Sequence, residues 1–348
     1  MSQGQEKGLK MKLSRMFKAT SLAISIGALT MTSALAQDNA TKEIMEVKVT
    51  QNQINCVSNI VYSQIITPRS IRKLHMTVLT PNTNTYKPVI IFFPGGGFTT
   101  ADHEKYFQMR YELAKAGYVV AAAEYRTVPN TFPAPLIDGK AAVRYLRAHA
   151  DIFGIDVDKI GVLGDFAGGY MSQIVGTTNG ETKYDVGDFK EFSSDVQAVC
   201  TIYGITNLLN IGEGFDKEIV DVHHSPAVTE ALLVHGPAFN LNPGSSILSD
   251  EKKALEASSI GHIKKDLPPF VIMHDDQDKL VSPVQSEQLY EALKKNGTKV
   301  DYVVLKGANH GDAFWYQKPV FDKVVSWFKE NLHASGKVIE DKKKVSNL

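Results

Sequence analysis

The sequence predicts an α/β fold with a mostly parallel central sheet flanked by helices. Six short, continuously apolar segments alternate with helical stretches, and such segments are typical of strands buried on both faces. They span residues 88–93, 118–123, 159–163, 196–203, 270–273 and 300–305. The lengths between them fit the helical crossovers that join parallel strands. At 348 residues, 43% of them hydrophobic, the chain can supply the core that this fold requires.

The sequence also predicts the edge of the sheet and two of the helices. Residues 48–80 contain stretches of alternating apolar and polar side chains, such as 73–79, which predicts antiparallel strands at the entry to the sheet. Residues 138–150 place apolar side chains on one helical face. Residues 282–297 begin with serine and proline and end in glycine, the start and stop signals of a helix.

The regular alternation is interrupted once. Residues 207–266 mix polar and apolar side chains with several glycines and prolines, and we interpret them as a cap or lid over the strand ends. We therefore predict a single domain over 42–333 with an insertion at 207–266. The charged residues 334–348 are predicted to be a disordered tail.

The N-terminus has the pattern of an export signal. Basic residues at 12, 15 and 18 precede an apolar run at 19–32, which is followed by Ser-Ala-Leu-Ala at 33–36. A membrane anchor is the alternative, but the run is shorter than the roughly 18–20 apolar residues that a span needs. We therefore expect a signal peptide at 1–36, a secreted or periplasmic mature chain, and no membrane span after cleavage.

Charge and cysteine content limit the possible partners. The chain has 38 basic and 38 acidic side chains, so nothing favours nucleic acid or an anionic membrane as a partner. An oxidising compartment permits a disulfide between Cys56 and Cys200. Cys200 lies in the apolar run 196–203, which favours a free thiol in a buried strand, and the pairing is left open. The sequence does not indicate an oligomeric state.

Two glycine-rich loops follow predicted strands, where open parallel sheets bind their ligands. Residues 94–98 read PGGGF, and three glycines let backbone amides point closely at a ligand oxygen. Residues 161–170 read GVLGDFAGGY, in which glycines flank a sharp strand-to-helix turn that normally carries an exposed serine nucleophile. Phe166 stands at that position. The alternatives are a plain glycine loop and a tight turn without catalytic meaning.

Two further loops carry an acid and a histidine. Residues 274–281 read HDDQDKLV, and Asp278 stands just ahead of the next predicted helix, where its carboxylate could orient a histidine. Residues 307–312 read GANHGD after the last strand, which makes His310 a candidate general base. A solvated acidic loop and an ordinary surface histidine are the alternatives.

The order of glycine loop, strand-to-helix turn, acid and histidine is that of an α/β-hydrolase. Over about residues 86–332 the chain resembles secreted bacterial carboxylesterases of that superfamily, near its hormone-sensitive-lipase-like and feruloyl or acetyl-xylan esterase-like groups. Further matching positions are Glu124-Tyr-Arg126, Phe132-Pro-Ala134 and Asp138. The resemblance implies an α/β-hydrolase fold, no cofactor, and a small-molecule or polysaccharide-linked ester as substrate.

Carried over to this chain, the resemblance implies specific roles. Asp278 corresponds to the acid of a Ser-His-Asp triad and His310 to its base. The backbone amides of Gly96, Gly97 and Ala167 correspond to the oxyanion donors. Pro94 departs from the family, since many members have histidine there, and this changes the support of the glycine loop while leaving its amides available.

Phe166 at the nucleophile position changes the chemistry. A benzyl group has no lone pair with which to attack a carbonyl, so the chain is expected to be inactive or strongly impaired. Asp165 and Ser172 are poor substitutes because of their positions, and a water activated by His310 is a poor one because the aromatic ring would occupy the acyl position. The alternative is a non-catalytic pseudoenzyme that binds an ester, a sugar or a protein through the retained pocket. Retention of the acid, the base and the glycines favours recent or deliberate loss of the serine.

A metal enzyme is the third class considered. The histidines at 223, 224 and 235 have no spacing typical of a metal site, and solvated histidines are the better interpretation. We therefore expect no metal in the site.

Overall fold

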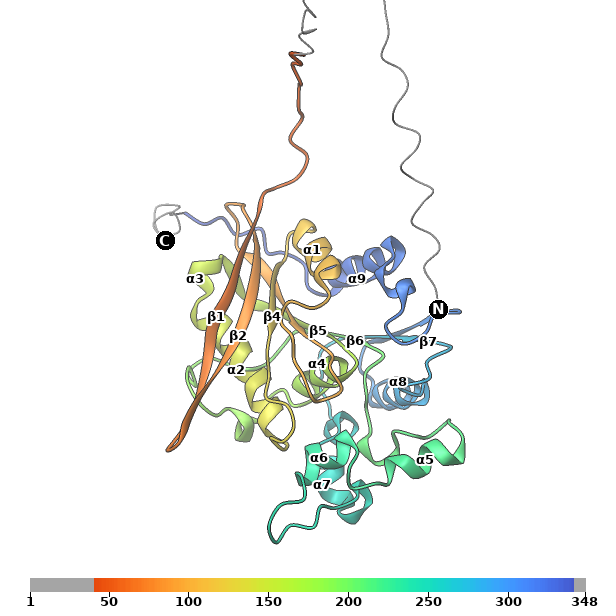
Figure 1. The fold of residues 1–348 in the computed structure, drawn as a ribbon. Helices are drawn as coiled ribbons and strands as arrows, with labels where there is room; N and C mark the ends of the chain where they lie inside the picture. The colour runs from red at the N-terminus through yellow and green to blue at the C-terminus, as the bar shows by residue number, and fades with distance from the viewer. Residues whose placement is uncertain (1–40, 341–348) are drawn as a thin grey trace, which may run out of the picture. The chain divides into compact units, whose positions relative to one another are not determined.

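The chain forms an eight-stranded, mostly parallel sheet with helices on both faces (Figure 1), which confirms the predicted fold class. The structure is a computed structural model that describes residues 41–340. The strand order is β1-β2-β4-β3-β5-β6-β7-β8, and only the β1–β2 and β2–β4 pairs are antiparallel. The strands are β1 (Ile54–Thr67), β2 (Ser70–Pro81), β3 (Lys87–Phe93), β4 (Val119–Ala123), β5 (Ile155–Asp165), β6 (Ala198–Ile202), β7 (Phe270–Asp275) and β8 (Val300–Leu305).

The six apolar runs of the sequence correspond to strands β3 to β8, and the alternating entry segment corresponds to β1 and β2. In β3 every residue is buried, because helices cover both faces of the central sheet. Val89, Ile91 and Phe93 point into one hydrophobic core, and Ile90 and Phe92 point into the other. This alternation of side chains is the period-2 geometry of a strand.

Helices divide between the two faces of the sheet. The core on one face takes side chains from α2 (Ala134–Ala148), α4 (Ala167–Thr177) and α8 (Val284–Asn296), and the other from α1 (Phe107–Lys115) and α9 (Lys318–Asn331). The short helix α3 (Ala150–Phe153) follows α2. The helix predicted at 138–150 corresponds to α2, which begins earlier, at Ala134. Pro135 lies in its first turn, where proline is tolerated because backbone amides there have no partner within the helix. The predicted helix at 282–297 is confirmed by α8.

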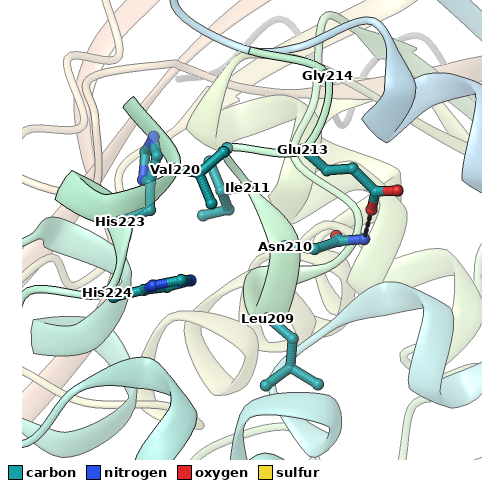
Figure 2. A pocket seen from close by; sticks show the side chains of 9 residues that line it. Leu209, Asn210, Ile211, Glu213, Gly214, Val220, His223 and His224 are labelled. Atoms are coloured by element: carbon teal, nitrogen blue, oxygen red, sulfur yellow. Dashed lines mark hydrogen bonds between the residues drawn. The ribbon is translucent and has the colours of Figure 1, made fainter. Parts of the chain in front are cut away.

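Residues 207–266 contribute no strand to the sheet. They form the short helices α5 (Lys217–His223), α6 (Thr229–His235) and α7 (Glu251–Glu256), joined by turns and 3-10 segments. A pocket of about 320 Å³ lies in this segment (Figure 2). It is lined by residues 209–214, Val220, His223 and His224. The role of the segment as a cap or lid stays a prediction.

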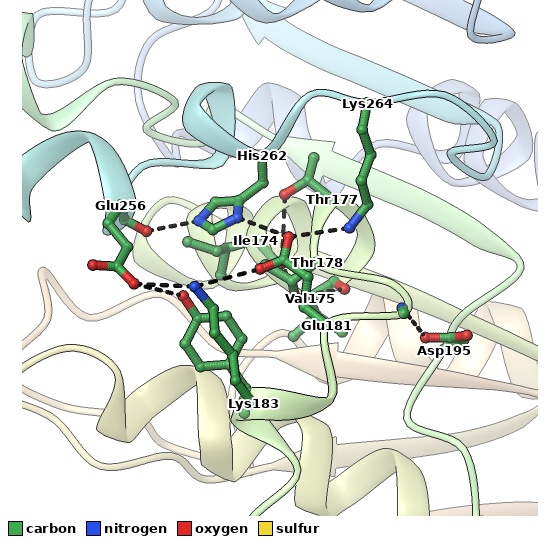
Figure 3. Close-up of polar contacts among 12 residues, drawn as sticks. Ile174, Val175, Thr177, Thr178, Glu181, Lys183, Asp195, Glu256, His262 and Lys264 are labelled. Atoms are coloured by element: carbon green, nitrogen blue, oxygen red, sulfur yellow. Dashed lines mark hydrogen bonds and ion pairs between the residues drawn. The ribbon is translucent and has the colours of Figure 1, made fainter. Parts of the chain in front are cut away.

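A cluster of charged side chains ties the same segment to the loop after α4 (Figure 3). Glu181 Oε1 accepts hydrogen bonds from His262 Nδ1 at 2.9 Å and Lys264 Nζ at 3.0 Å. His262 Nε2 lies 2.7 Å from the backbone oxygen of Glu256. Burial by itself raises the pKa of Glu181, but the hydrogen bonds from His262 and Lys264 outweigh it and leave that pKa below its ordinary value. The ionised carboxylate therefore stabilises the junction.

The compact unit begins at Val49, and residues 41–48 have exposed side chains and no regular secondary structure. At the other end, Tyr86 N donates to Lys337 O and Ile339 N donates to Asn84 O. These bonds order a stretch that was expected to belong to a disordered tail from 334, because backbone pairing does not depend on the charged side chains there. Residues 341–348 and the expected signal peptide at 1–36 lie outside the described residues.

Both cysteines are free thiols. Cys56 is exposed on β1, and Cys200 is buried in β6, as its apolar neighbours predicted. Burial raises the pKa of the Cys200 thiol. Among residues 41–340, no helix combines the length and the apolar character needed to cross a membrane.

Candidate active site

The sharp turn predicted at 161–170 connects β5 directly to α4. Phe166 alone separates them, with φ 53° and ψ −116°. Its φ lies in the left-handed region, which is strained for a bulky side chain. The flanking glycines are sterically required: a Cβ on Gly164 would lie 1.9 Å from Gly168 O, and one on Gly168 would lie 1.9 Å from Phe93 O. The turn therefore has the sharp, glycine-flanked geometry that the sequence predicts.

Three backbone amides, in the glycine loop and at this turn, have no hydrogen-bond partner among the described residues. In the described part of the chain, the amides of Gly96, Gly97 and Ala167 have no hydrogen-bond acceptor. Gly97 has φ 59°, and a Cβ added there would lie 3.5 Å from Phe166 Cε1. Gly97 therefore lies next to the Phe166 ring, and Ala167 follows Phe166 directly at the start of α4. Such free amides are suited to stabilising a developing negative oxygen.

Asp278 and His310 form a hydrogen-bonded pair, although they follow different strands. His310 Nδ1 lies 2.7 Å from Asp278 Oδ2. Asp278 Oδ1 accepts from the amides of Leu280 at 2.7 Å and Val281 at 2.9 Å. Burial by itself raises the pKa of Asp278, but hydrogen bonds from His274 and His310 outweigh it and hold that pKa well below its ordinary value. The carboxylate is therefore charged at neutral pH and fixes the Nδ1–H tautomer of His310.

The Phe166 ring occupies the space next to His310. The two ring centroids are 4.7 Å apart at an interplanar angle of 85°, an edge-to-face contact. Tyr203, after β6, also packs against His310, with the two ring centroids 4.4 Å apart. The group that the histidine faces is thus an apolar ring without an attacking atom.

The two neighbouring side chains considered as substitutes for the serine are already engaged. Asp165 Oδ1 accepts from Gly95 N at 2.8 Å, and its Oδ2 lies 2.6 Å from Lys105 Nζ. Ser172 Oγ donates to Gly169 O and Cys200 O in a fully buried position. Both side chains are held by these internal contacts, which agrees with the expectation that neither replaces the serine.

Sequence reasoning missed the support beneath Asp278. His274 is fully buried at the end of β7, and its Nε2 lies 3.3 Å from Asp278 Oδ2. On its other side, His274 Nδ1 lies 2.6 Å from Ser286 Oγ in α8. The signal was the histidine four residues before the acid, at the same strand end. Ser286 and His274 together hold the acid in place.

Asp275 was also missed. It is fully buried, and neither of its carboxylate oxygens has a hydrogen-bond partner among the described residues. Burial first, and then the negative charge of Asp278, raise the pKa of Asp275 to about 7.

The same strand end contains the one arrangement among the described residues that could hold a metal ion. His274, Asp275 and Asp278 each offer a ligand atom, and these atoms lie within 4.8 Å of one another. The nitrogen and oxygen donors would suit a metal such as zinc. However, Asp278 Oδ2 is the oxygen that His310 contacts, so a cation bound there would compete with the Asp278–His310 pair.

The histidines at 223, 224 and 235 do not converge on one point. His223 Nδ1 lies 2.5 Å from Glu230 Oε1, and His235 Nε2 lies 3.4 Å from Ser249 Oγ. His223 and His235 close helices α5 and α6 rather than lying in loops. They form no shared ligand set among the described residues.

Comparison with known proteins gives the same fold and a family match. The family model described as BD-FAE matches residues 76–293. Two similar curated proteins come from Mycobacterium tuberculosis. The probable carboxylic ester hydrolase LipM is 28% identical over 210 residues, which are 60% of this chain and 45% of that protein. Esterase LipC is 28% identical over 227 residues, which are 64% of this chain and 53% of that protein. The chain spans about half the length of these relatives.

Two solved structures are similar in fold. A truncated carbohydrate esterase from gut microbiota superimposes with a TM-score of 0.68 at 23% identity, covering 81% of this chain and 97% of that chain. The acetyl ester-xyloside bifunctional hydrolase of Caldicellulosiruptor lactoaceticus superimposes with a TM-score of 0.63 at 23% identity, covering 78% of this chain and 93% of that chain. Both likenesses show that the architecture is that of the α/β-hydrolase fold.

Proposed function

Since the chain belongs to the BD-FAE family, whose model matches residues 76–293, we propose that it is a carboxylic ester hydrolase scaffold with Phe166 at its nucleophile position. The proposed substrates are acyl, feruloyl or acetyl esters, including those on plant polysaccharides. The names of the relatives, two of them a carboxylic ester hydrolase and an esterase, support the reaction class. The names of the similar structures, a carbohydrate esterase and an acetyl ester-xyloside hydrolase, support the substrate class.

One observation carries the proposal. His310, hydrogen-bonded to Asp278, lies against Phe166 on the strained turn between β5 and α4, and the three unpartnered amides belong to that turn and to the glycine loop beside it. A base, its orienting acid and an oxyanion site around one turn residue are the parts of a Ser-His-Asp acyl-transfer mechanism.

The roles of the parts follow from their geometry. With a serine at 166, His310 Nε2 would take the hydroxyl proton as Oγ attacks the ester carbonyl, and Asp278 would stabilise the resulting imidazolium. The amides of Gly96, Gly97 and Ala167 would hold the carbonyl oxygen as it becomes negative. With Phe166 no attacking atom exists, and only roughly 10³–10⁴-fold catalysis over water from the remaining parts is expected.

The test compares the purified chain with its Phe166→Ser variant on p-nitrophenyl acetate. We expect the chain as it stands to remain near background and the serine variant to be faster by several orders of magnitude. Phe166→Ser combined with His310→Ala is the matched control and should return to background. If the unchanged chain is already fast, the assignment of the nucleophile position is wrong. Methyl ferulate and acetylated xylan then distinguish the feruloyl and acetyl classes.

A non-catalytic binding protein is the second candidate. It is favoured by the aromatic packing of the site, in which the partly exposed Phe166 ring lies against His310 and offers an aromatic surface to an aromatic acid or a sugar. A folded Phe166→Ser variant without esterase activity, together with binding of ferulate or xylo-oligosaccharides by the unchanged chain, would support this function.

For the location of the protein we propose export with cleavage after Ala36, on the basis of the signal-peptide pattern at 1–36. N-terminal sequencing of the protein from an exporting bacterial host should give Gln37 as the first residue. An intact N-terminus in the cytoplasmic fraction would contradict this proposal.

A further inference from the structure

The glycine loop at 94–97 is held one peptide plane at a time. In a trans peptide the C=O and N–H groups point in opposite directions, so fixing one of them fixes the other. In the first plane, Tyr125 OH donates to Pro94 O at 2.7 Å, and on the opposite side Gly95 N donates to Asp165 Oδ1 at 2.8 Å. Both ends of this peptide therefore have a partner.

The third plane is held from within the loop. Gly96 O accepts hydrogen bonds from Thr99 N at 3.0 Å, Thr100 N at 3.2 Å and Thr99 Oγ1 at 2.8 Å. A Cβ on Gly96 would lie 2.3 Å from Thr100 O, so only glycine permits this approach. Because Gly96 O faces these donors, the amide of Gly97 points the other way.

The second plane, between Gly95 and Gly96, depends on Lys105. Its Nζ lies 3.4 Å from Gly95 O and 2.6 Å from Asp165 Oδ2. No other group among the described residues donates to Gly95 O. Lys105 thus directs the Gly95 carbonyl, and the amide of Gly96, an expected oxyanion donor, takes the opposite direction.

The charge on Lys105 also supports Asp165. The Asp165 side chain is only 3% exposed, whereas that of Lys105 is 38% exposed. A buried carboxylate that loses its cation is destabilised by its missing solvation. Loss of Lys105 would therefore remove its hydrogen bond to Gly95 O. It would also weaken the hydrogen bond from Gly95 N to Asp165, because Asp165 would lose its cation.

We propose that Lys105 is a positioning residue that, with Asp165, aims the Gly96 amide at the oxyanion site. This inference rests on the proposed function. It also accounts for Pro94, which has no backbone N–H and no side-chain donor, and so cannot support the loop as a histidine would. In this chain the support comes from a lysine in the turn before α1.

The kinetic experiment uses the Phe166→Ser background with Lys105→Met and Lys105→Arg. Losing one oxyanion donor costs roughly 10²–10³-fold in kcat. We expect Lys105→Met to lower kcat at least about tenfold with KM nearly unchanged, and Lys105→Arg to recover part of the loss. Lys115→Met, on the exposed face of α1, is the matched control and should keep kcat. An unchanged kcat in Lys105→Met, with Phe166→Ser active, overturns the inference alone. An inactive Phe166→Ser variant overturns the proposed function and this inference with it.

A second measurement uses the chain with Phe166 in place and does not depend on activity. Hydrogen exchange of the peptide that contains residues 94–98 should be faster in Lys105→Met than in the unchanged chain, while Lys115→Met should leave it as it was. Equal exchange in all three proteins would mean that Lys105 does not hold the loop, and would overturn the inference.

Discussion

The buried carboxyl of Asp275 should make the stability of the protein fall as the pH rises. Its side chain is fully buried without a hydrogen-bond partner among the described residues. Burial, followed by repulsion from Asp278, raises its pKa from 3.8 to about 7. A raised carboxyl pKa means that the folded state holds the proton more tightly than the unfolded state does. The contribution of Asp275 to stability is therefore fully present below pH 3.8, is lost progressively between pH 3.8 and 7, and is absent above pH 7.

The size of the effect follows from the shift. Each pKa unit corresponds to about 1.4 kcal/mol, so a shift of about three units amounts to at most about 4 kcal/mol above pH 7. Asp275→Asn removes the charge and keeps the shape of the side chain. We expect the variant to gain up to about 4 kcal/mol in the free energy of unfolding at pH 8 and almost nothing at pH 4, where the aspartic acid is itself neutral.

Urea unfolding at several pH values from 4 to 8 measures this difference, with the fluorescence of the buried Trp315 and Trp327 as the signal. Asp188→Asn, which removes an exposed carboxylate, is the control and should show a small difference at every pH. A gain for Asp275→Asn that is the same at pH 4 and pH 8, or a loss at pH 8, would refute the reasoning.

Three further predictions concern the junction, the turn and the thiols. Glu181→Gln should cost about 2 kcal/mol at pH 7, because the carboxylate loses two charge-assisted bonds. Folding lowers the pKa of Glu181, so the cost of Glu181→Gln should shrink as the pH falls through the acid range. Urea unfolding of both proteins at pH 7 and pH 3 measures this change, and an equal cost at the two pH values would contradict the prediction. Gly168→Ala should destabilise the fold by at least about 3 kcal/mol, because its Cβ would meet Phe93 O at 1.9 Å, and a thermal melt close to that of the unchanged chain would count against the turn geometry. A thiol reagent should modify only Cys56 in the native protein, and both Cys56 and Cys200 in urea. Rapid modification of Cys200 in the native protein would show that β6 is accessible and would contradict its burial.

Local pattern was sufficient to predict the strands and the order of the site's loops. The continuous apolar run in β3 indicates burial on both faces of the sheet. Successive side chains of a strand point to opposite faces, and in β3 the side chains on both faces are buried. The glycines around Phe166 indicate a sharp turn, because a Cβ atom at these positions would collide with backbone atoms. Such properties belong to a few neighbouring residues, and the sequence expresses them directly.

The contacts that define the site depend on which strands lie side by side. Asp278 and His310 meet because β7 and β8 are neighbours in the sheet, and Gly95 meets Asp165 because β3 pairs with β5 rather than with β4 alone. The residues around Lys105 in the sequence do not predict its contact with Gly95 O. Its position in sequence, in a polar turn, would suit a solvated side chain equally well.

By itself, the sequence determined the α/β architecture and the strained turn at Phe166, since each depends on residue type at a given position. The tertiary structure alone decided that the Phe166 ring packs against His310, that Asp275 is buried without a partner, and that Lys105 supports the glycine loop. The physical reason is that burial and hydrogen bonding between distant segments are properties of the packed sheet, in which residues far apart along the chain become neighbours.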